Sequence, residues 1–221
     1  MGPSPSADSK RRNGARSEAQ PSEDRTGSEP ARSSADLAAL SEGERDALRG
    51  VALRAVEGAA HGADPPDVDP GAHAPRLRAP GASFVTLRRE GELRGCVGRL
   101  EAVEPLVRDV ARSAHRAACA DTRFERVLAH ELAALELKIS VLSSLEPLRV
   151  TSEADLLAAL RPGIDGLVLR EGLRGATFLP AVWESLLAPE AFLRELLRKA
   201  GLPERYWSPT LRFERYTSLE F

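Results

Sequence analysis

The chain has 221 residues, 42% of them hydrophobic, and a formal net charge of -2. This length is enough for one domain of good size or two small ones. The nearly balanced charge excludes a global electrostatic attraction to nucleic acid or to an anionic membrane. The sequence has two cysteines, no apolar signal segment and no apolar run long enough to span a bilayer. It therefore predicts a cytoplasmic protein with reduced thiols.

Residues 1–36 differ in composition from the rest of the chain. They contain no Val, Ile, Leu, Phe, Tyr or Trp and are rich in Ser, Pro, Gly, Arg and Glu. Because such a segment cannot bury enough apolar surface to offset its ordering entropy, we expect a disordered tail over 1–36 and one folded domain over 37–221. The basic run Lys10-Arg11-Arg12 would suit RNA or a partner, but the composition around it favours a solvated tail.

The domain reads as hairpins alternating with helices. Ser41 and Glu44 form a capping-box pattern that opens the first helix, and the Pro- and Gly-rich stretch 63–81 predicts a long loop after it. Residue periodicity predicts the remaining elements. In chain order these are strands at 84–87 and 93–97, a helix from 105, a strand at 135–141, a helix at 152–160, strands at 166–169 and 173–178, a helix at 191–200 and a strand at 211–215.

The two expected hairpins resemble each other. Residues 87–96 match 169–176 with two one-residue gaps, and each hairpin precedes a helix. This similarity predicts a duplicated hairpin-plus-helix unit. Arg94-Gly95 recurs as Arg174-Gly175 and is therefore expected to be architectural, whereas Ala176 replaces Cys96 in the second copy.

Several familiar sites are absent from the sequence. There is no phosphate-binding GxxxxGK[ST] loop, no dinucleotide GxGxxG fingerprint, no zincin helix and no GxSxG elbow. No Cys/His cluster has the spacing of a zinc site, so the sequence predicts no metal centre. A cofactor remains unknown at this stage.

Cys96 is the best single candidate for chemistry. It follows Gly95 and precedes Gly98 at the end of a hairpin strand, where glycine permits close approach of a ligand to the backbone. Arg94 beside it would lower the pKa of a thiol and so favour the reactive thiolate. The alternative is a small buried cysteine with a structural role, and spacing alone favours that alternative.

The run Asp121-Thr122-Arg123-Phe124 also has two interpretations. In one, it is a turn at the end of a helix in which Phe124 fills the core. In the other, Asp121 and Arg123 are polar walls of a cleft, and the spacing favours the turn. His115 on the preceding helix would suit a base, but a lone helical histidine is more often a surface or hydrogen-bonded residue.

Several runs resemble the AMMECR-domain family, which is called AmmeMemoRadiSam system protein A in bacteria and archaea. The family motif residues match Arg94, Gly95, Cys96, Gly98, Asp121, Arg123 and Phe124. The other matching runs, which together extend over Leu37–Phe221, are Phe84-Val85-Thr86-Leu87, Ile139-Ser140-Val141-Leu142-Ser143, Asp165-Gly166-Leu167-Val168-Leu169, Phe178-Leu179-Pro180, Trp183-Glu184, Lys199-Ala200-Gly201-Leu202 and Trp207.

The resemblance implies an α+β fold with a mainly antiparallel sheet, flanking helices, a duplicated β–α unit and a larger and a smaller lobe. The family has no established reaction. Its members are often encoded beside a Memo-like, dioxygenase-related protein and a radical SAM protein, and a role in RNA modification has been proposed for it. The chain departs from the family at Ala181, usually a glutamine, at Lys138, often an acidic residue, and at Val97, usually isoleucine.

Three functional hypotheses follow from the residues and the resemblance. In the first, the chain is an enzyme component in which Cys96 and Asp121 are catalytic and Arg94, Gly95, Gly98 and Arg123 bind the substrate. In the second, it is a non-catalytic binding module for the Memo-like and radical SAM proteins. In the third, its arginines bind RNA, which would make the affinity depend on salt. The expected aromatic anchors of the core are Trp183 and Trp207.

Overall fold

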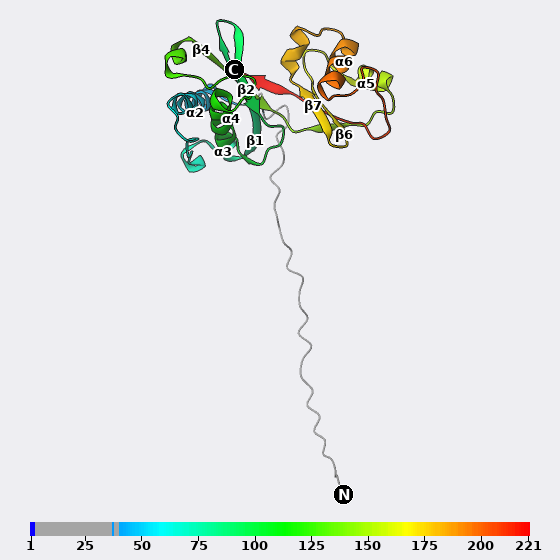
Figure 1. The fold of residues 1–221 in the computed structure, drawn as a ribbon, viewed down its shortest axis with the longest axis horizontal. Helices are drawn as coiled ribbons and strands as arrows, with labels where there is room; N and C mark the ends of the chain where they lie inside the picture. The colour runs from blue at the N-terminus through cyan, green and yellow to red at the C-terminus, as the bar shows by residue number, and fades with distance from the viewer. Residues whose placement is uncertain (3–36, 38–39) are drawn as a thin grey trace.

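The computed structural model describes residues 1–2, 37 and 40–221, so nearly all of the expected tail over 1–36 lies outside the described residues. Two lobes lie side by side, the larger carrying α2, α3 and α4 and the smaller carrying α5 and α6 (Figure 1). Each lobe is built on an antiparallel sheet, which confirms the predicted α+β class. In the described ranges, no helix is both long and apolar enough to cross a membrane.

The sheet of the larger lobe has the strand order β2-β1-β4-β9, and the short strand β3 pairs with β1. Helices α2 and α4 cover one of its faces, where Leu48, Val110 and Ile139 belong to a continuous buried core. The elements of this lobe are α2 (Glu42–Ala60), α3 (Pro75–Arg78), β1 (Pro80–Arg89), β2 (Glu92–Gly98), β3 (Glu104–Pro105), α4 (Leu106–Cys119), β4 (Leu135–Leu142) and β9 (Ser218–Glu220).

Local chemistry explains where these elements begin. Ser41 Oγ accepts a hydrogen bond from the Glu44 amide, and the Glu44 carboxylate accepts one from the Ser41 amide, so the predicted capping box is present. The stretch 63–81 is less irregular than expected, because it contains the 3₁₀ helix Pro70–Ala72 and α3. Each begins at a proline, whose fixed φ suits the first position of a helix.

The sheet of the smaller lobe has the order β5-β8-β6-β7. Its core contains Trp183 stacked on Phe192 with ring centroids 3.9 Å apart, and Trp207 stacked on Phe213 at 5.8 Å. Both tryptophans are therefore packing anchors, as predicted. The elements are β5 (Glu146–Leu148), α5 (Glu153–Ala159), β6 (Gly166–Glu171), β7 (Arg174–Phe178), the 3₁₀ helix Pro180–Glu184, α6 (Pro189–Lys199) and β8 (Arg212–Tyr216).

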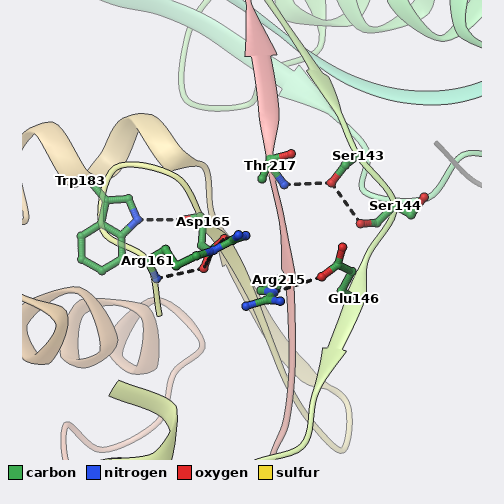
Figure 2. Close-up of polar contacts among 8 residues, drawn as sticks. All are labelled: Ser143, Ser144, Glu146, Arg161, Asp165, Trp183, Arg215 and Thr217. Atoms are coloured by element: carbon green, nitrogen blue, oxygen red, sulfur yellow. Dashed lines mark hydrogen bonds and ion pairs between the residues drawn. The ribbon is translucent and has the colours of Figure 1, made fainter. Parts of the chain in front are cut away.

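The chain passes between the lobes twice, from β4 to β5 and from β8 to β9, and hydrogen bonds join the two crossings (Figure 2). The Ser143 amide donates to Thr217 O at 2.9 Å, and the Thr217 amide donates to Ser143 Oγ at 2.9 Å. Nearby, Arg215 pairs with Glu146 at 3.1 Å. A small apolar cluster that contains residues of both sheets adds to this junction, namely Ala82, Leu142, Val168 and Tyr216.

The two hairpins share their architecture but not their residue register. In the first ladder Leu87 faces Gly95 and Arg88 faces Leu93, so Arg94 is a bulged residue without a partner on β1. The second ladder has no such irregularity, and Arg170 faces Gly175. Counted from the turns, the two Arg-Gly pairs therefore occupy different ladder positions, although each hairpin is followed by a helix as predicted.

Candidate functional site

Cys96 lies on the face of the larger sheet that α2 and α4 do not cover. Val85 and Leu87 of β1 are buried in the core beneath the helices, so Thr86 between them faces the opposite way. Cys96 and Lys138 are the cross-strand partners of Thr86 and therefore share its face. The Thr86 hydroxyl donates to Cys96 Sγ at 3.3 Å. The thiol is free and partly exposed, rather than buried in the core.

Asp121 and Arg123 bind the backbone of Cys96. Strand β2 is at the edge of its sheet, and the Cys96 amide donates to Asp121 Oδ2 at 2.8 Å, while Arg123 Nη2 donates to Cys96 O at 3.3 Å. Arg123 Nε also donates to Asp121 Oδ1 at 2.9 Å. Residues 121–124 form a turn, because the Phe124 amide donates to Asp121 O. The side chains of Asp121 and Arg123 bind the Cys96 backbone where a neighbouring strand would otherwise pair with β2.

The same contacts keep Asp121 ionised. Hydrogen bonds from Arg123, followed by that from the Cys96 amide, lower the pKa of Asp121 to about 2, against the opposing effect of burial. A group with this pKa holds no proton to donate at neutral pH. The structure therefore favours a role for Asp121 in orienting Arg123 and the Cys96 backbone over a role as a proton donor.

Arg94 holds the loop that follows α4. Its guanidinium donates to both oxygens of Glu131, at 2.9 and 3.0 Å, and to the carbonyls of Glu125 at 2.7 Å and Arg126 at 3.1 Å. These contacts commit Arg94 to the segment that also contains Asp121. The bulge at Arg94 interrupts the strand alternation that would otherwise place Arg94 and Cys96 on the same face.

The two motif glycines are required for close packing. A Cβ at Gly95 would lie 2.1 Å from Ala117 O in α4, and one at Gly98 would lie 2.2 Å from Ser83 O in β1. No side chain fits at either distance, so each glycine permits close approach of neighbouring backbone. In this structure packing accounts for both residues without a ligand.

Lys199 brings the smaller lobe into the site. It is the last residue of α6, and its ammonium donates to Thr177 O at 2.9 Å and lies 5.0 Å from the centre of the Phe178 ring. Desolvation lowers the pKa of Lys199, while Cys96 raises it and Arg123 lowers it electrostatically. Lys199, which was not among the predicted site residues, thus interacts electrostatically with both residues. Its signals were its rarity, as one of three lysines, and its place in a family run.

A hollow of about 550 Å³ lies at the junction of the lobes, near the same face of the sheet. Glu220 on its wall forms an ion pair with Lys138 and accepts a hydrogen bond from Ser140 Oγ at 3.2 Å. Ala181 also lines it. Two of the three departures from the family pattern are thus connected with one pocket, Ala181 as a lining residue and Lys138 through its ion pair with Glu220. The residues that line the hollow include Pro180, Ala181, Trp183, Glu184, Leu187 and Glu220.

His115 does not belong to this site. It is buried, its Nε2 lies 2.9 Å from Ala63 O, and Cys119 Sγ donates to its backbone oxygen at 3.3 Å. It is therefore the hydrogen-bonded histidine that the sequence favoured. Among the residues that the structure describes, no group of three or more His, Cys, Asp or Glu side chains is placed to hold a metal ion.

The site thus combines a partly exposed thiol, a hydroxyl that donates to it and two cationic side chains, one from each lobe. Such a set suits an anionic ligand whose reactive or polar group lies at the sulfur. The ionised Asp121 fixes the position of Arg123 rather than competing for a proton.

Comparison with known proteins places the chain in a family. The AMMECR1 family model matches residues 50–221. The chain is 38% identical over 144 residues to a protein of Methanothermobacter thermautotrophicus, covering 62% of this chain and 73% of that protein. It is 37% identical over 177 residues to a protein of Aeropyrum pernix, covering 76% and 73%. The crystal structure of the uncharacterized protein PH0010 from Pyrococcus horikoshii superposes with a TM-score of 0.71 at 30% identity, covering 78% of this chain and 88% of the other. The chain belongs to the AMMECR1 family.

Proposed function

We propose that this protein binds an anionic substrate between its lobes, beside Cys96, as a component of the AmmeMemoRadiSam system. The observation that carries the proposal is the partly exposed Cys96 thiol, which accepts a hydrogen bond from Thr86 and whose backbone is bound by Arg123. Lys199 of the smaller lobe interacts electrostatically with both Cys96 and Arg123. In this proposal Lys199 and Arg123 bind the anionic group, Cys96 contacts the substrate through its thiol, and Asp121 orients Arg123.

The charge balance of the site supports an anion. Arg123 is paired with Asp121, and Lys138 is paired with Glu220. Within the described part of the chain, Lys199 has no carboxylate at ion-pair distance, and its hydrogen-bond partner Thr177 supplies only a carbonyl oxygen. A cation without a counter-charge at ion-pair distance favours binding of an anion.

The proposed partners and pathway are those that the resemblance to the AMMECR-domain family implies. A Memo-like, dioxygenase-related protein and a radical SAM protein would act with this chain on the same substrate in a modification pathway. The formal net charge of -2 gives no reason to choose RNA as the anion. A non-catalytic role as a binding module for the two proteins is the alternative, and it would leave pathway activity intact when the thiol is removed.

Alkylation of the native protein tests the proposal. In a Cys119→Ser background, anionic iodoacetate and neutral iodoacetamide would compete for Cys96, with product read by mass spectrometry. We expect Lys199→Met to lower the ratio of the iodoacetate rate to the iodoacetamide rate about fivefold, because only the anionic reagent is attracted by the ammonium, whereas a change in the thiolate fraction alters both rates alike. The control is the double variant Lys138→Met/Glu220→Gln, which removes both charges of an ion pair on the same sheet face and leaves the net charge unchanged. An unchanged ratio of the two rates in Lys199→Met would overturn the proposal.

Co-purification with the Memo-like and radical SAM proteins tests the pathway assignment. Binding of both partners by the wild-type chain, with loss of pathway product but not of binding in Cys96→Ser, would support a substrate site at the thiol. Full pathway activity of Cys96→Ser would instead favour the binding module.

A further inference from the structure

We infer that the hollow at the lobe junction is the second half of the same ligand site and takes an apolar end group of the substrate. The inference rests on the proposed function and deepens it. The ligand would be an elongated molecule with an anionic group at Cys96 and Lys199 and an apolar group beside Trp183.

A line of polar side chains leads across the sheet from the thiol to the hollow. Cys96, Thr86 and Lys138 are successive cross-strand partners on β2, β1 and β4. Lys138 pairs with Glu220 on β9, and Glu220 lines the hollow. The three strand spacings, at roughly 4.8 Å each, separate the two ends by about 14 Å.

The smaller lobe connects the same two ends. Lys199 bonds to Thr177 and lies against Phe178. The chain then runs through Leu179 directly into Pro180 and Ala181, which line the hollow. Both lobes therefore extend from the cationic end to the apolar end, so one molecule seated between them would meet both.

The composition of the hollow decides which group it takes. Its volume of about 550 Å³ is in the range of small-molecule sites. Pro180, Trp183 and the 78% exposed Leu187 give it apolar walls. Its charged lining residues are the carboxylates Glu184 and Glu220, which would repel an anion. The anionic end of the ligand therefore belongs at Lys199 and the apolar end here.

Thiol-directed reagents of different length test this arrangement without knowledge of the substrate. Methanethiosulfonates transfer their thio group to the Cys96 sulfur and release methanesulfinate. In the Cys119→Ser protein we would compare a methyl reagent with two reagents that carry a chain of about ten atoms, the reach needed for about 14 Å. One chain ends in phenyl and the other in carboxylate.

We expect the phenyl-ended reagent to label Cys96 about tenfold faster than the methyl reagent, because its ring is buried in the hollow before reaction. The carboxylate-ended reagent should gain nothing. Ala181→Phe, which fills the hollow, should abolish the gain and leave the methyl rate unchanged. Ala133→Phe is the matched control, because Ala133 is an exposed alanine of another 3₁₀ helix, Ala129–Ala134.

The outcomes separate this inference from the proposed function. Equal rates for the methyl and phenyl-ended reagents, or a gain that persists in Ala181→Phe, would overturn the inference and leave the anion site standing. No labelling of Cys96 by the methyl reagent would overturn both. A normal methyl rate in Ala181→Phe shows that the variant is folded.

Discussion

The clamp between Arg94 and Glu131 gives a stability prediction with a defined pH dependence. Hydrogen bonds from Arg94, against the opposing effect of burial, lower the pKa of Glu131 from 4.5 to about 2. A lowering of this size corresponds to about 3 kcal/mol of stability at neutral pH. Arg89, the other cation on Glu131, is 42% exposed, and solvent screening reduces the expected value to about 2 kcal/mol. Glu131→Gln should lose this amount.

The pH dependence distinguishes charge from packing. Because the folded-state pKa of Glu131 is lowered, its stabilisation is complete above about pH 4.5 and is lost as the pH falls toward 2. Urea unfolding of the wild type and Glu131→Gln would be compared at about pH 7, 5 and 3. The difference in free energy of unfolding should fall below half of its neutral value at about pH 3.

The control is Glu136→Gln, which alters an exposed carboxylate of β4 and should change stability by less than about 0.5 kcal/mol. A Glu131→Gln difference that stays constant from about pH 7 to about pH 3 would refute the electrostatic reasoning. It would show that shape or the hydrogen bond to the Leu128 amide, at 2.8 Å, carries the effect instead.

Two further predictions concern a glycine and a buried acid. Gly95→Ala places a Cβ 2.1 Å from Ala117 O and should lower the free energy of unfolding in urea by more than about 3 kcal/mol. The control is Gly175→Ala, whose Cβ would lie 3.1 Å from its nearest neighbour and which should lower it by less than about 1 kcal/mol. Equal losses would contradict the packing argument. Burial raises the pKa of Asp109 to about 6 despite Arg99 at 2.7 Å, so its stabilisation is complete below about pH 4 and lost as the pH rises through 6. Relative to Asp109→Asn, the wild type should gain up to about 3 kcal/mol in unfolding free energy between about pH 7 and pH 4, and a loss over that range would show the sign to be wrong.

Local patterns predicted most of the elements because their causes are local. The capping box at Ser41, the alternation along β4 and the turn of the first hairpin each depend on residues within a few positions of one another. The stretch 63–81 was harder to predict, because its short helices are too brief to show a periodicity. The division of the strands into two sheets could not be predicted from these local patterns either, because it depends on which strands pair with one another.

The candidate site was only partly predictable for the same reason. Cys96, Asp121 and Arg123 were selected, and the structure brings all three together. The surroundings of Arg94 depend on a one-residue bulge that no periodicity reveals. Arg94 was predicted to bind the substrate, whereas in the structure its guanidinium binds the loop that follows α4. Lys199 lies more than a hundred positions from Cys96 in the sequence, so only the packing of one lobe against the other places it in the site.

This dependence on two lobes makes their junction part of the site. The electrostatic interaction of Lys199 with Cys96 depends on a fixed relation between α6 and β2, yet these elements belong to different lobes. The relation is held by two crossings joined through Ser143 and Thr217 and by the apolar cluster that contains Tyr216. Rigid support of this kind preorganises a binding site, because little conformational entropy is lost when the ligand arrives. A ligand that spans the lobes would therefore bind to an arrangement that the fold has already formed, rather than drawing two separate lobes together.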